Sequence, residues 1–307
     1  DIGKIEAEAL EDAEGNIYPV QDSLVFVKNL PSKGYKTLKK SSLIKHDNTP
    51  FNLSGNSLET PFYVAEIDDS GMFTRIYDKA NDREMIQSGK RANLMRMYED
   101  KPIYYDNWDI DIYYTEKGWD LDSAESIKWS EPGNVYIKLD IERKISNSTV
   151  QQSIYFYADS PRIDFVTHVD WKEHQHLLKV YFPIDVHTDE ATFDIQFGNI
   201  KRKTHKNTSW DVARFEYCGQ KWADVSEGNY GVSLLNDCKY GHSINESCIG
   251  LTLIKSGIEP NPVTDQEKHV FTYSLYPHNG TWRNGTVQEA YRLNQPALVY
   301  SGGDFST

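Results

Sequence analysis

The stretch "SIYFYADSPRIDFVTHVDW", residues 153–171, decides the fold class, because apolar and polar side chains alternate along it. Ile154 and Phe156 share one face of the first half, and the Ser160–Pro161 break separates it from a second run. Successive side chains of a β-strand point to opposite faces of a sheet, so this alternation predicts two half-buried strands. The residues that share one face of the second run are Ile163, Phe165, Thr167, Val169 and Trp171.

The same period of two recurs along the chain, whereas the period of a helix is nearly absent. It is found in "LLKVYFPIDV", residues 177–186, and in "NVYIKLDIER", residues 134–143, while turns such as "DDSG" at 68–71 punctuate the chain. Many alternating strands indicate antiparallel sheets packed face to face, so the sequence predicts an all-β protein with a large antiparallel β-sandwich. The predicted buried faces of the two segments are Leu178, Val180, Phe182, Ile184 and Val186, and Val135, Ile137, Leu139 and Ile141.

The first part of the chain has a different character. We expect short strands at residues 24–26 and 35–38, followed by the polar, turn-rich stretch "HDNTPFNLSGNSLET", residues 46–60, which resembles a linker. A boundary near residue 48 would leave too few residues on its N-terminal side to stabilise a core. We therefore predict that residues 1–48 are the end of a small β domain and that residues 49–307 form the main sandwich.

Composition excludes several classes of protein. With 38% hydrophobic and 13% aromatic residues among 307, the chain can bury a core and is not of the disordered type. The net charge of −13 argues against nucleic-acid binding, which needs a basic patch to neutralise phosphates. No apolar run approaches the ~20 residues that a membrane span needs, so no membrane partner is expected.

The cysteines suggest a compartment. Cys218, Cys238 and Cys248 are an odd and sparse set without a Cys-x-x-Cys pair, so we expect no disulfide framework and a reducing, cytoplasmic location. The opening residues "DIGKIEAEAL" resemble neither a signal peptide nor a natural start. We therefore expect the sequence to be a fragment or a processed product.

Carboxylates and aromatic rings gather in "YEDKPIYYDNWDIDIYY", residues 98–114. Asp106, Asp109 and Asp111 lie among tyrosines and Trp108, and a strand over residues 109–114 would place Asp109 and Asp111 on one face. Carboxylates beside rings are typical of sugar sites, and paired carboxylates serve glycosidases as acid and nucleophile. The alternative is that these aspartates are polar strand faces and turn caps.

A second candidate is "GNIKRKTHKNTSWDVARFEYCGQKWADVSE", residues 198–227, which mixes donors, acceptors and rings with almost no aliphatic run. Such a segment could line a polar cleft. Alternatively, Trp210 and Phe215 are buried, and Asp211 and Arg214 form a local ion pair worth only ~0.2–1 kcal/mol. The candidate cleft residues are Arg202, His205, Asn207, Trp210, Asp211 and Arg214.

Two further stretches carry histidines. His174 and His176 flank Gln175 beside Glu173, but a zinc site needs three or four ligands, so we interpret them as a surface pair. "SLYPHNGTW", residues 274–282, reads as a loop at an edge of the sandwich. The sequence holds no Gly-x-Ser-x-Gly elbow and no phosphate-binding glycine loop.

Several long motifs resemble one enzyme family. "YEDKPIYYDNWDIDIYY" (98–114), "NTSWDVARFE" (207–216), "KWADVSEGNYGVSLLNDCKYG" (221–241) and "FTYSLYPHNGTW" (271–282) are similar to the C-terminal β region of α-mannosidases of glycoside hydrolase family 38. The vacuolar, cytosolic and bacterial branch is the most similar. The resemblance covers essentially the whole chain and implies a galactose mutarotase-like supersandwich.

The resemblance also implies an enzyme whose reactive half lies elsewhere. Family members carry an N-terminal α/β barrel and a three-helix bundle, with a zinc ion and an aspartate nucleophile, and hydrolyse α-mannosides with retention through a covalent glycosyl-enzyme. No position here matches the zinc ligands or the nucleophile. The resemblance thus implies zinc only in the full-length enzyme, a mannose-containing oligosaccharide as substrate, and no hydrolase activity for this segment alone.

By motif position, loops of the sandwich would reach over the sugar. Arg202 in "NIKRKTH" is the candidate for an arginine that binds the mannose, and Asp106, Trp108 and Asp109 are candidates from the other loop, with Tyr105 as the alternative to Trp108. The further candidates are His205, Asn207, Asp211 and Arg214.

Two other classes of function stay open. The sandwich could be an independent carbohydrate-binding module, or it could be a scaffold that provides only an oligomerisation surface. Family enzymes are often oligomers, so a homo-oligomer is a possible assembly, while the N-terminal catalytic and helical domains of the same protein are the expected partners.

Overall fold

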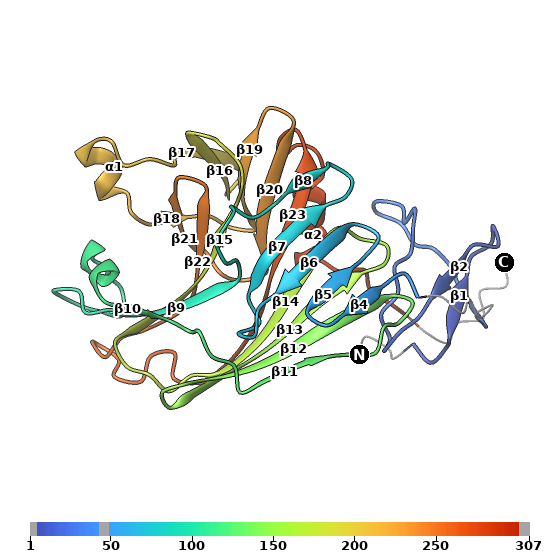
Figure 1. The fold of residues 1–307 in the computed structure, drawn as a ribbon, viewed down its shortest axis with the longest axis horizontal. Coiled ribbons are helices and arrows are strands. Elements are labelled where there is room, and N and C mark those ends of the chain that lie inside the picture. Colours follow the sequence, from blue (N-terminus) through green and yellow to red (C-terminus); the bar gives the residue numbers. More distant parts are fainter. Residues whose placement is uncertain (1–4, 43–48, 301–307) are drawn as a thin grey trace.

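The computed structural model describes residues 5–42 and 49–300, and β-strands dominate it (Figure 1). Every pair of neighbouring strands for which a register is defined is antiparallel, as predicted. The largest sheet has nine strands in the order β11 (Ser126–Trp129), β12 (Tyr136–Ile145), β13 (Ser148–Tyr157), β14 (Ile163–Asp170), β23 (Lys268–Asn279), β20 (Tyr230–Asn236), β19 (Trp222–Glu227), β16 (Glu190–Ile195) and β17 (Gly198–Lys203).

Two smaller sheets face this nine-stranded sheet. The first has the order β10 (Gly118–Asp120), β9 (Leu94–Glu99), β15 (His176–Pro183), β22 (Cys248–Ser256), β21 (Gly241–Asn245) and β18 (Tyr217–Cys218). The second has the order β4 (Asn52–Ser54), β5 (Ser57–Glu59), β6 (Tyr63–Ile67), β7 (Phe73–Asp78) and β8 (Arg83–Glu84). Side chains of all three sheets meet in one apolar core.

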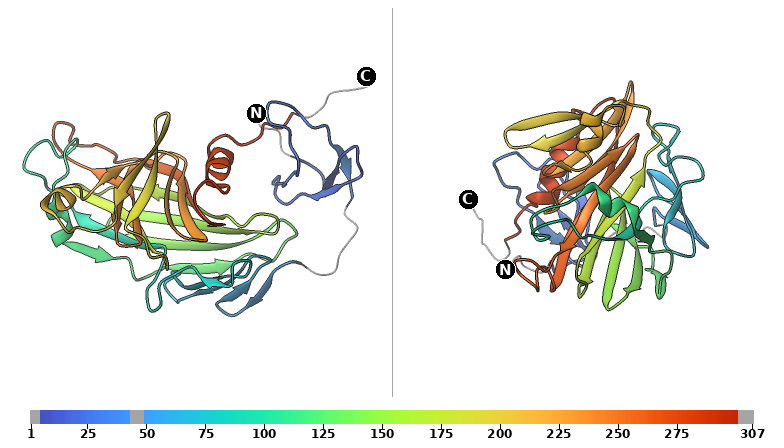
Figure 2. Two further views of the ribbon diagram at one scale, coloured as in Figure 1. Left: turned by 90° about the horizontal axis from the view of Figure 1, so that it is seen from above. Right: turned by 90° about the vertical axis from the view of Figure 1, so that its left-hand side faces the viewer.

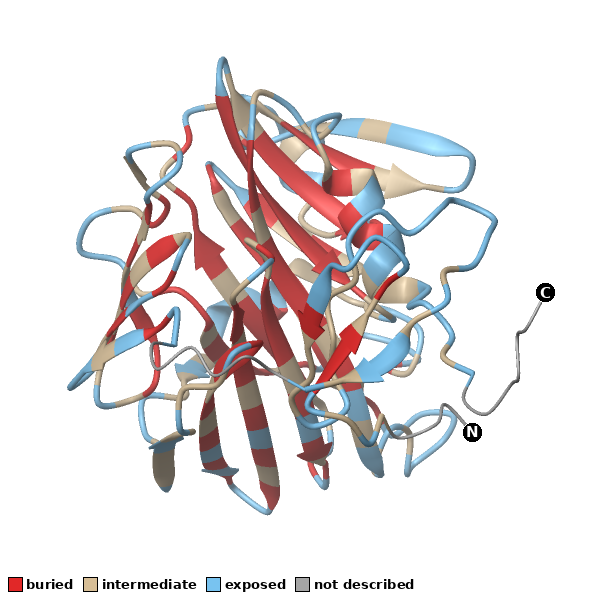
Figure 3. Ribbon diagram, turned by 90° about the vertical axis from the view of Figure 1, so that its right-hand side faces the viewer, coloured by how far each residue is buried: buried red, intermediate tan, exposed pale blue. Residues whose placement is uncertain are grey.

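The core confirms the predicted strand faces. Every residue predicted to point inward from segments 135–141, 154–156, 163–171 and 178–186 is buried. Along β12 and β13, buried residues alternate with partly or fully exposed ones, and Figure 3 shows this banding on strands of the large sheet. Phe165 lies where the three sheets meet. Its ring centroid is 4.9 Å from that of Tyr273 on β23, 5.5 Å from that of Phe182 on β15 and 6.1 Å from that of Phe73 on β7. The large antiparallel sandwich is therefore confirmed.

A buried polar network crosses this core. Gln152 on β13 accepts a 2.7 Å hydrogen bond from Asn93 Nδ2 and donates one of 2.8 Å to the Tyr273 hydroxyl. The Tyr273 hydroxyl in turn donates to Asn93 Oδ1 at 2.8 Å. Because an unpaired polar group would be costly at this depth, the closed ring of hydrogen bonds favours one alignment of the two facing sheets.

The outer face of the nine-stranded sheet is partly covered by α2 (Thr286–Asn294). Ala290 of α2 packs with Trp222 of β19 and Leu235 of β20, and the rings of Trp222 and Trp282 stack with centroids 5.2 Å apart. Beneath the start of α2, His278 Nε2 lies 2.7 Å from Asp224 Oδ2, and both side chains are buried. His278 and Trp282, predicted in an edge loop, thus lie at the end of β23 and beside α2.

The N-terminal residues form a separate three-stranded sheet in the order β2 (Ile17–Pro19), β1 (Ala9–Glu11) and β3 (Lys39–Ser41), set beside the sandwich (Figure 2). The strands predicted at 24–26 and 35–38 are wrong. Residues 21 and 24 form only an isolated bridge, and residues 35–38 belong to no strand. The predicted domain boundary near residue 48 falls outside the described residues.

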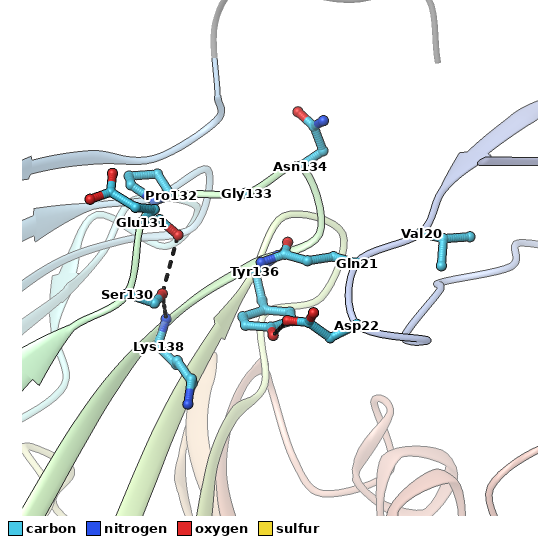
Figure 4. Close-up of a pocket in the computed structure, with 10 residues that line it drawn as sticks. All are labelled: Val20, Gln21, Asp22, Ser130, Glu131, Pro132, Gly133, Asn134, Tyr136 and Lys138. Atoms are coloured by element: carbon cyan, nitrogen blue, oxygen red, sulfur yellow. Dashed lines mark hydrogen bonds between the residues drawn. The ribbon is translucent and has the colours of Figure 1, made fainter. Parts of the chain in front are cut away.

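A polar crevice of about 470 Å³ separates this small sheet from the sandwich (Figure 4). Gln21 crosses it, and its Oε1 accepts hydrogen bonds of 3.1 Å from the backbone N–H groups of both Val135 and Tyr136. The Tyr136 hydroxyl donates to Asp22. Gly133 faces the Gln21 amide so closely that an added Cβ would displace it. These contacts dock the small sheet onto the start of β12.

Within the described residues, none of the helices has the length and apolarity required to cross a bilayer.

Truncating the central ring tests this description of the core. We expect Phe165→Ala to lower the free energy of unfolding by ~3–5 kcal/mol, because it leaves a cavity where three sheets meet. His168→Ala, an exposed position on the same strand, should change it by less than ~0.5 kcal/mol. Urea unfolding measures both variants. Equal stabilities for the two would contradict the central position of Phe165.

Candidate functional site

The two segments singled out in the sequence lie at the same end of the sandwich (Figure 1, Figure 2). Residues 100–117 connect β9 to β10 and contain the 3-10 helix η1 (Ile112–Glu116). Residues 204–216 connect β17 to β18 and contain α1 (Ser209–Ala213). Since β9 and β18 are strands of one six-stranded sheet, that sheet carries both segments. We call residues 100–117 and 204–216 together the loop end.

The two segments contact each other beneath their exposed tips. The Tyr114 hydroxyl donates a 2.5 Å hydrogen bond to Glu216 Oε1, and the ring centroids of Tyr114 and Phe215 lie 6.4 Å apart. Lys179, which the sequence analysis missed, is fully buried under this contact and pairs with Glu216. In "LLKVYF" it occupies a position that alternation assigns to solvent, so the pattern gave no signal for a buried charge.

Asp106 anchors the first segment from inside. Its side chain is buried, and its Oδ1 accepts hydrogen bonds from the backbone N–H groups of Ile258 (2.9 Å) and Glu259 (2.7 Å), while Oδ2 accepts one from Gln175 Nε2 (3.0 Å). Burial alone would raise the pKa of Asp106, but the bonds from Glu259 and Gln175 hold it below its usual range. Asp106 thus caps the loop after β22, and its role in sugar binding stays a prediction.

Residues 109–114 do not form the strand that would place Asp109 and Asp111 on one face. Asp111 instead is the N-cap residue of η1, whose first turn is closed by the hydrogen bond from Tyr114 N–H to the Asp111 carbonyl at 3.2 Å. The Asp111 carboxylate accepts a 3.0 Å hydrogen bond from Ile103 N–H, which folds the segment back on itself. Asp109 is exposed, and within the described residues its carboxylate accepts a hydrogen bond from the neighbouring Ile110 N–H alone, at 3.0 Å. Asp109 and Asp111 therefore do not share the face of a strand.

Aromatic rings at the loop end are open to solvent. Trp108 and Tyr105 stack with centroids 5.4 Å apart, and their exposed fractions are 74% and 52%. Trp210 on α1 is also 74% exposed, so the alternative in which it is buried is wrong. Exposed tyrosine and tryptophan side chains are the usual anchors of binding surfaces, because they offer large apolar faces at low entropic cost.

Arg202 lies on β17, an edge strand of the nine-stranded sheet, with its guanidinium over the Tyr217 ring at 5.5 Å from the centroid. Its Nε is buried, and no described residue forms a hydrogen bond or an ion pair with the guanidinium. The flanking lysines differ, since Lys201 and Lys203 pair with Glu190 at 2.9 and 3.2 Å. Because neighbouring side chains of a strand point to opposite faces, Arg202 is kept away from this carboxylate.

The remaining candidates form or flank α1. Asp211 closes a capping box with Thr208: Asp211 N–H donates to Thr208 Oγ1 and Thr208 N–H donates to Asp211 Oδ2, each at 3.2 Å. The Thr208 hydroxyl donates to Asp211 Oδ2 at 2.7 Å, and this bond, helped by the one from Thr208 N–H, holds the pKa of Asp211 below its usual range although burial opposes it. Asp211 lies 3.7 Å from His205 Nδ1, and the described residues form no Asp211–Arg214 ion pair. Asn207 and Arg214 are exposed.

The structure thus brings part of the predicted set together. The guanidinium of Arg202 lies over the Tyr217 ring, and His205 lies beside Asp211. Burial raises the pKa of the Tyr217 hydroxyl, and the charge of Arg202 opposes this. Asp106, Trp108 and Asp109 form a second group on the other segment. No hydrogen bond or ion pair between described side chains joins the two groups directly, so the Tyr114–Glu216 contact is what relates them.

A buried stack supports Tyr217. The Phe193 ring lies 5.4 Å from the Tyr217 ring and 5.7 Å from the imidazole of His242, measured between centroids. His242 is fully buried and lies 3.2 Å from the Tyr240 carbonyl oxygen through Nδ1. Burial lowers the pKa of His242 to about 4, although the hydrogen bond to Tyr240 opposes this. The Tyr217 ring under Arg202 therefore packs on Phe193, which in turn packs on an imidazole that is neutral at pH 7.

One group of three possible metal ligands occurs within residues 5–42 and 49–300, and it consists of Asp265, Glu267 and His269. Both carboxylates are exposed, and His269 Nε2 hydrogen-bonds to the Asp265 carbonyl at 2.7 Å. Such an exposed group does not fit the closed ligand set of a zinc site. His174 contacts Gln266, while the ring of His176 lies 6.1 Å from that of Trp119.

The chain has relatives of known activity. The family model described as "Glycosyl hydrolases family 38 C-terminal domain" matches residues 58–263. Alpha-mannosidase G of Dictyostelium discoideum is 38% identical over 243 residues, which are 77% of this chain and 22% of that protein. Human alpha-mannosidase 2C1 is 37% identical over 249 residues, which are 79% of this chain and 24% of that protein. The chain thus corresponds to less than a quarter of the length of these relatives.

Solved structures share the fold. An alpha-mannosidase from Enterococcus faecalis V583 superposes with a TM-score of 0.71 at 15% identity, over 94% of this chain and 40% of that one. A glycosyl hydrolase family 38 protein from Enterococcus faecalis gives a TM-score of 0.68 at 16% identity, over 83% of this chain and 34% of that one. At these identities the likeness concerns the fold alone.

Replacing the Asp106 carboxylate with a neutral amide tests its anchoring role. We expect Asp106→Asn to lower the free energy of unfolding by ~1.5–3 kcal/mol at pH 7, because hydrogen bonds to a buried charge are lost or weakened. Asp109→Asn, on the same segment but exposed, is the matched control and should stay within ~0.5 kcal/mol of the unsubstituted chain. Urea unfolding of both variants decides. A smaller effect at Asp106 than at Asp109 would refute the anchor.

The pH dependence of stability tests the buried imidazole. Because the folded-state pKa of His242, about 4, is below its usual 6.5, the unfolded chain binds a proton first as the pH falls. Its contribution is fully present above pH ~6.5 and is lost as the pH falls to ~4, with a total of about 3 kcal/mol. In His242→Gln this part of the slope should vanish, whereas His168→Gln should keep it. An unchanged slope in His242→Gln would contradict the assignment.

Proposed function

This chain is a C-terminal domain of glycosyl hydrolase family 38, and from this premise we propose that it completes the sugar cleft of a retaining α-mannosidase. In this proposal the loop end faces the bound sugar, and the nucleophile and the acid–base carboxylate come from an N-terminal catalytic domain of the same protein. The segment alone has no hydrolase activity.

The observation that carries the proposal is the unpartnered guanidinium of Arg202. It is partly buried, it is positioned over the Tyr217 ring, and no described residue accepts its N–H groups. A guanidinium offers five donors in a fixed fork, so one that lacks partners at a partly buried site is suited to bind the oxygens of a ligand. Mannose hydroxyls, or a carboxylate of the catalytic domain that contacts them, supply such acceptors.

The exposed rings at the loop end give the proposed cleft an apolar wall. Trp108 stacks on Tyr105, and the pair is anchored because the intervening Asp106 is bound to the backbone at 258–259. Ring faces held in this way can pack against the C–H face of a sugar while polar side chains bind its hydroxyls. Asp109, His205, Asn207, Asp211 and Arg214 are the polar candidates of the proposal around these rings.

The chemistry itself would come from outside this chain. In a retaining glycosidase one carboxylate forms a covalent glycosyl-enzyme, and a second acts first as acid and then as base. The proposed zinc, when bound in the catalytic domain, would polarise oxygens of the substrate. The residues of this chain would bind and orient the sugar and exclude water from part of its surface.

We further propose a cytoplasmic protein. Cys218, Cys238 and Cys248 are free thiols, two of them exposed, which suits a reducing compartment better than an oxidising one. A homo-oligomer stays a prediction that light scattering of the full-length protein checks.

The second candidate function is an independent carbohydrate-binding module, which the exposed Trp108–Tyr105 pair favours. Calorimetric titration of the isolated chain with mannosides separates the two functions. If the chain only completes a cleft, no measurable binding is expected, because the contacts of the catalytic domain are missing. An independent module would bind mannosides saturably, and Trp108→Ala would abolish that binding.

Loss of one guanidinium tests the cleft. In the full-length protein we expect Arg202→Ala to lower kcat/KM for mannoside hydrolysis by ~10–150-fold, since a charge-assisted hydrogen bond is worth ~1.5–3 kcal/mol. Lys201→Ala, one residue away on the opposite face of β17, should leave kcat/KM within about twofold. Thermal unfolding should be the same for both variants. Equal hydrolysis rates for the two would remove Arg202 from the cleft.

A further inference from the structure

A buried charged contact joins the two segments of the loop end to the sheet below. Lys179 of β15 pairs with Glu216, and its Nζ lies 3.4 Å from the Tyr114 hydroxyl and 5.5 Å from the centroid of the Tyr114 ring. The Tyr114 hydroxyl donates to the same Glu216 oxygen at 2.5 Å. One carboxylate oxygen therefore receives one donor from the first segment and one from the sheet.

The surroundings exclude water from this contact. The side chain of Lys179 is fully buried, that of Glu216 is 14% exposed, and Tyr114 is 5% exposed. Tyr98 and Leu177 are buried beside it, with Ile110, Tyr181 and Phe215 packed at its margin. Burial lowers the pKa of Lys179 while Glu216 opposes this, and burial together with Glu216 raises the pKa of Tyr114.

Such a contact is a poor choice for stability alone. Removing two charges from water carries a large desolvation cost, so apolar residues of similar volume are often as stable or more stable. Once formed, however, a buried charge tolerates few other arrangements, because leaving any member unpaired carries that cost without compensation. The contact therefore specifies where the segments lie relative to each other more strongly than it stabilises the chain.

We propose that Lys179, Glu216 and Tyr114 are positioning residues that make residues 100–117 and 204–216 a single unit, so that Arg202 and Trp108 keep a fixed relative placement. The consequence for catalysis rests on the proposed function, whereas the coupling of the two segments does not. Arg202 lies two residues before the start of the second segment, and Trp108 lies within the first. No hydrogen bond or ion pair among the described residues joins either one to the buried triad, so the triad acts on them through the segments that carry them.

Amide hydrogen exchange of this chain tests the coupling. We expect Tyr114→Phe, which removes one hydroxyl from the first segment, to accelerate exchange about tenfold in the second, residues 204–216, because a bond to a charge is lost. Glu216→Gln should act in reverse and accelerate exchange in residues 100–117. Tyr98→Phe is the matched control: its hydroxyl lies 2.7 Å from that of Tyr181 in the same cluster, but neither residue belongs to the loop end. It should leave both segments unchanged.

A purely structural role predicts a different result. Acceleration confined to the substituted segment, or spread equally over β20 and β23, would overturn the coupling. Because Tyr114→Phe keeps the ring and its packing, failure to fold is not the expected outcome, and Glu216→Gln gives an independent measurement in the opposite direction.

Hydrolysis by the full-length protein tests the positioning. We expect Tyr114→Phe to lower kcat/KM about tenfold, mainly through KM, and Tyr98→Phe to leave it unchanged. If exchange in the partner segment rises but kcat/KM of Tyr114→Phe is unaffected, while Arg202→Ala still lowers it, the positioning role is wrong. If Arg202→Ala has no effect, the cleft assignment fails instead, and the exchange experiment still decides the coupling.

Discussion

The structure depends on covering one face of a nine-stranded sheet. That face is mostly apolar, with Gln152 and Thr167 buried among its apolar side chains, and a five-stranded and a six-stranded sheet together cover it. Phe165 stands at the line where both smaller sheets meet the large one. Because both smaller sheets pack into one core, the six-stranded sheet is fixed relative to the nine-stranded sheet. The two segments of the loop end are connected to strands of the six-stranded sheet and are therefore positioned with it.

The outer side of the six-stranded sheet is covered by the loop end, which holds the candidate functional residues. Along β15, Leu178 and Val180 point into the core, whereas Leu177 and Lys179 point the other way, beneath the loop end. A strand that is buried on both faces is unusual for an antiparallel sheet with one solvated side. Here the second cover is made of irregular segments rather than of another sheet, which leaves their tips free to carry rings and charges.

Much of the fold could be predicted, because long strands with one buried face leave a pattern of period two. The faces centred on Phe165 and Val180 are correct for this reason. The N-terminal strands were missed, since three residues carry too little pattern and Gln21 is held by contacts with the distant residues 135–136. At the loop end, composition identifies both segments. The pairing of Lys179 with Glu216, however, depends on the path of the chain through two sheets, which no local sequence pattern predicts.

The edge strand β17 also bears on how copies of this molecule meet. An unprotected edge offers its free backbone groups to any passing strand and so invites fibrous aggregation. On the edge strand β17, Lys201 pairs with Glu190, and Lys203 pairs with Glu190 and Asp189. A strand added at this edge would have to desolvate these ammonium groups. The charged outer edge of the hairpin that carries Arg202 thus disfavours the addition of a further strand from another copy.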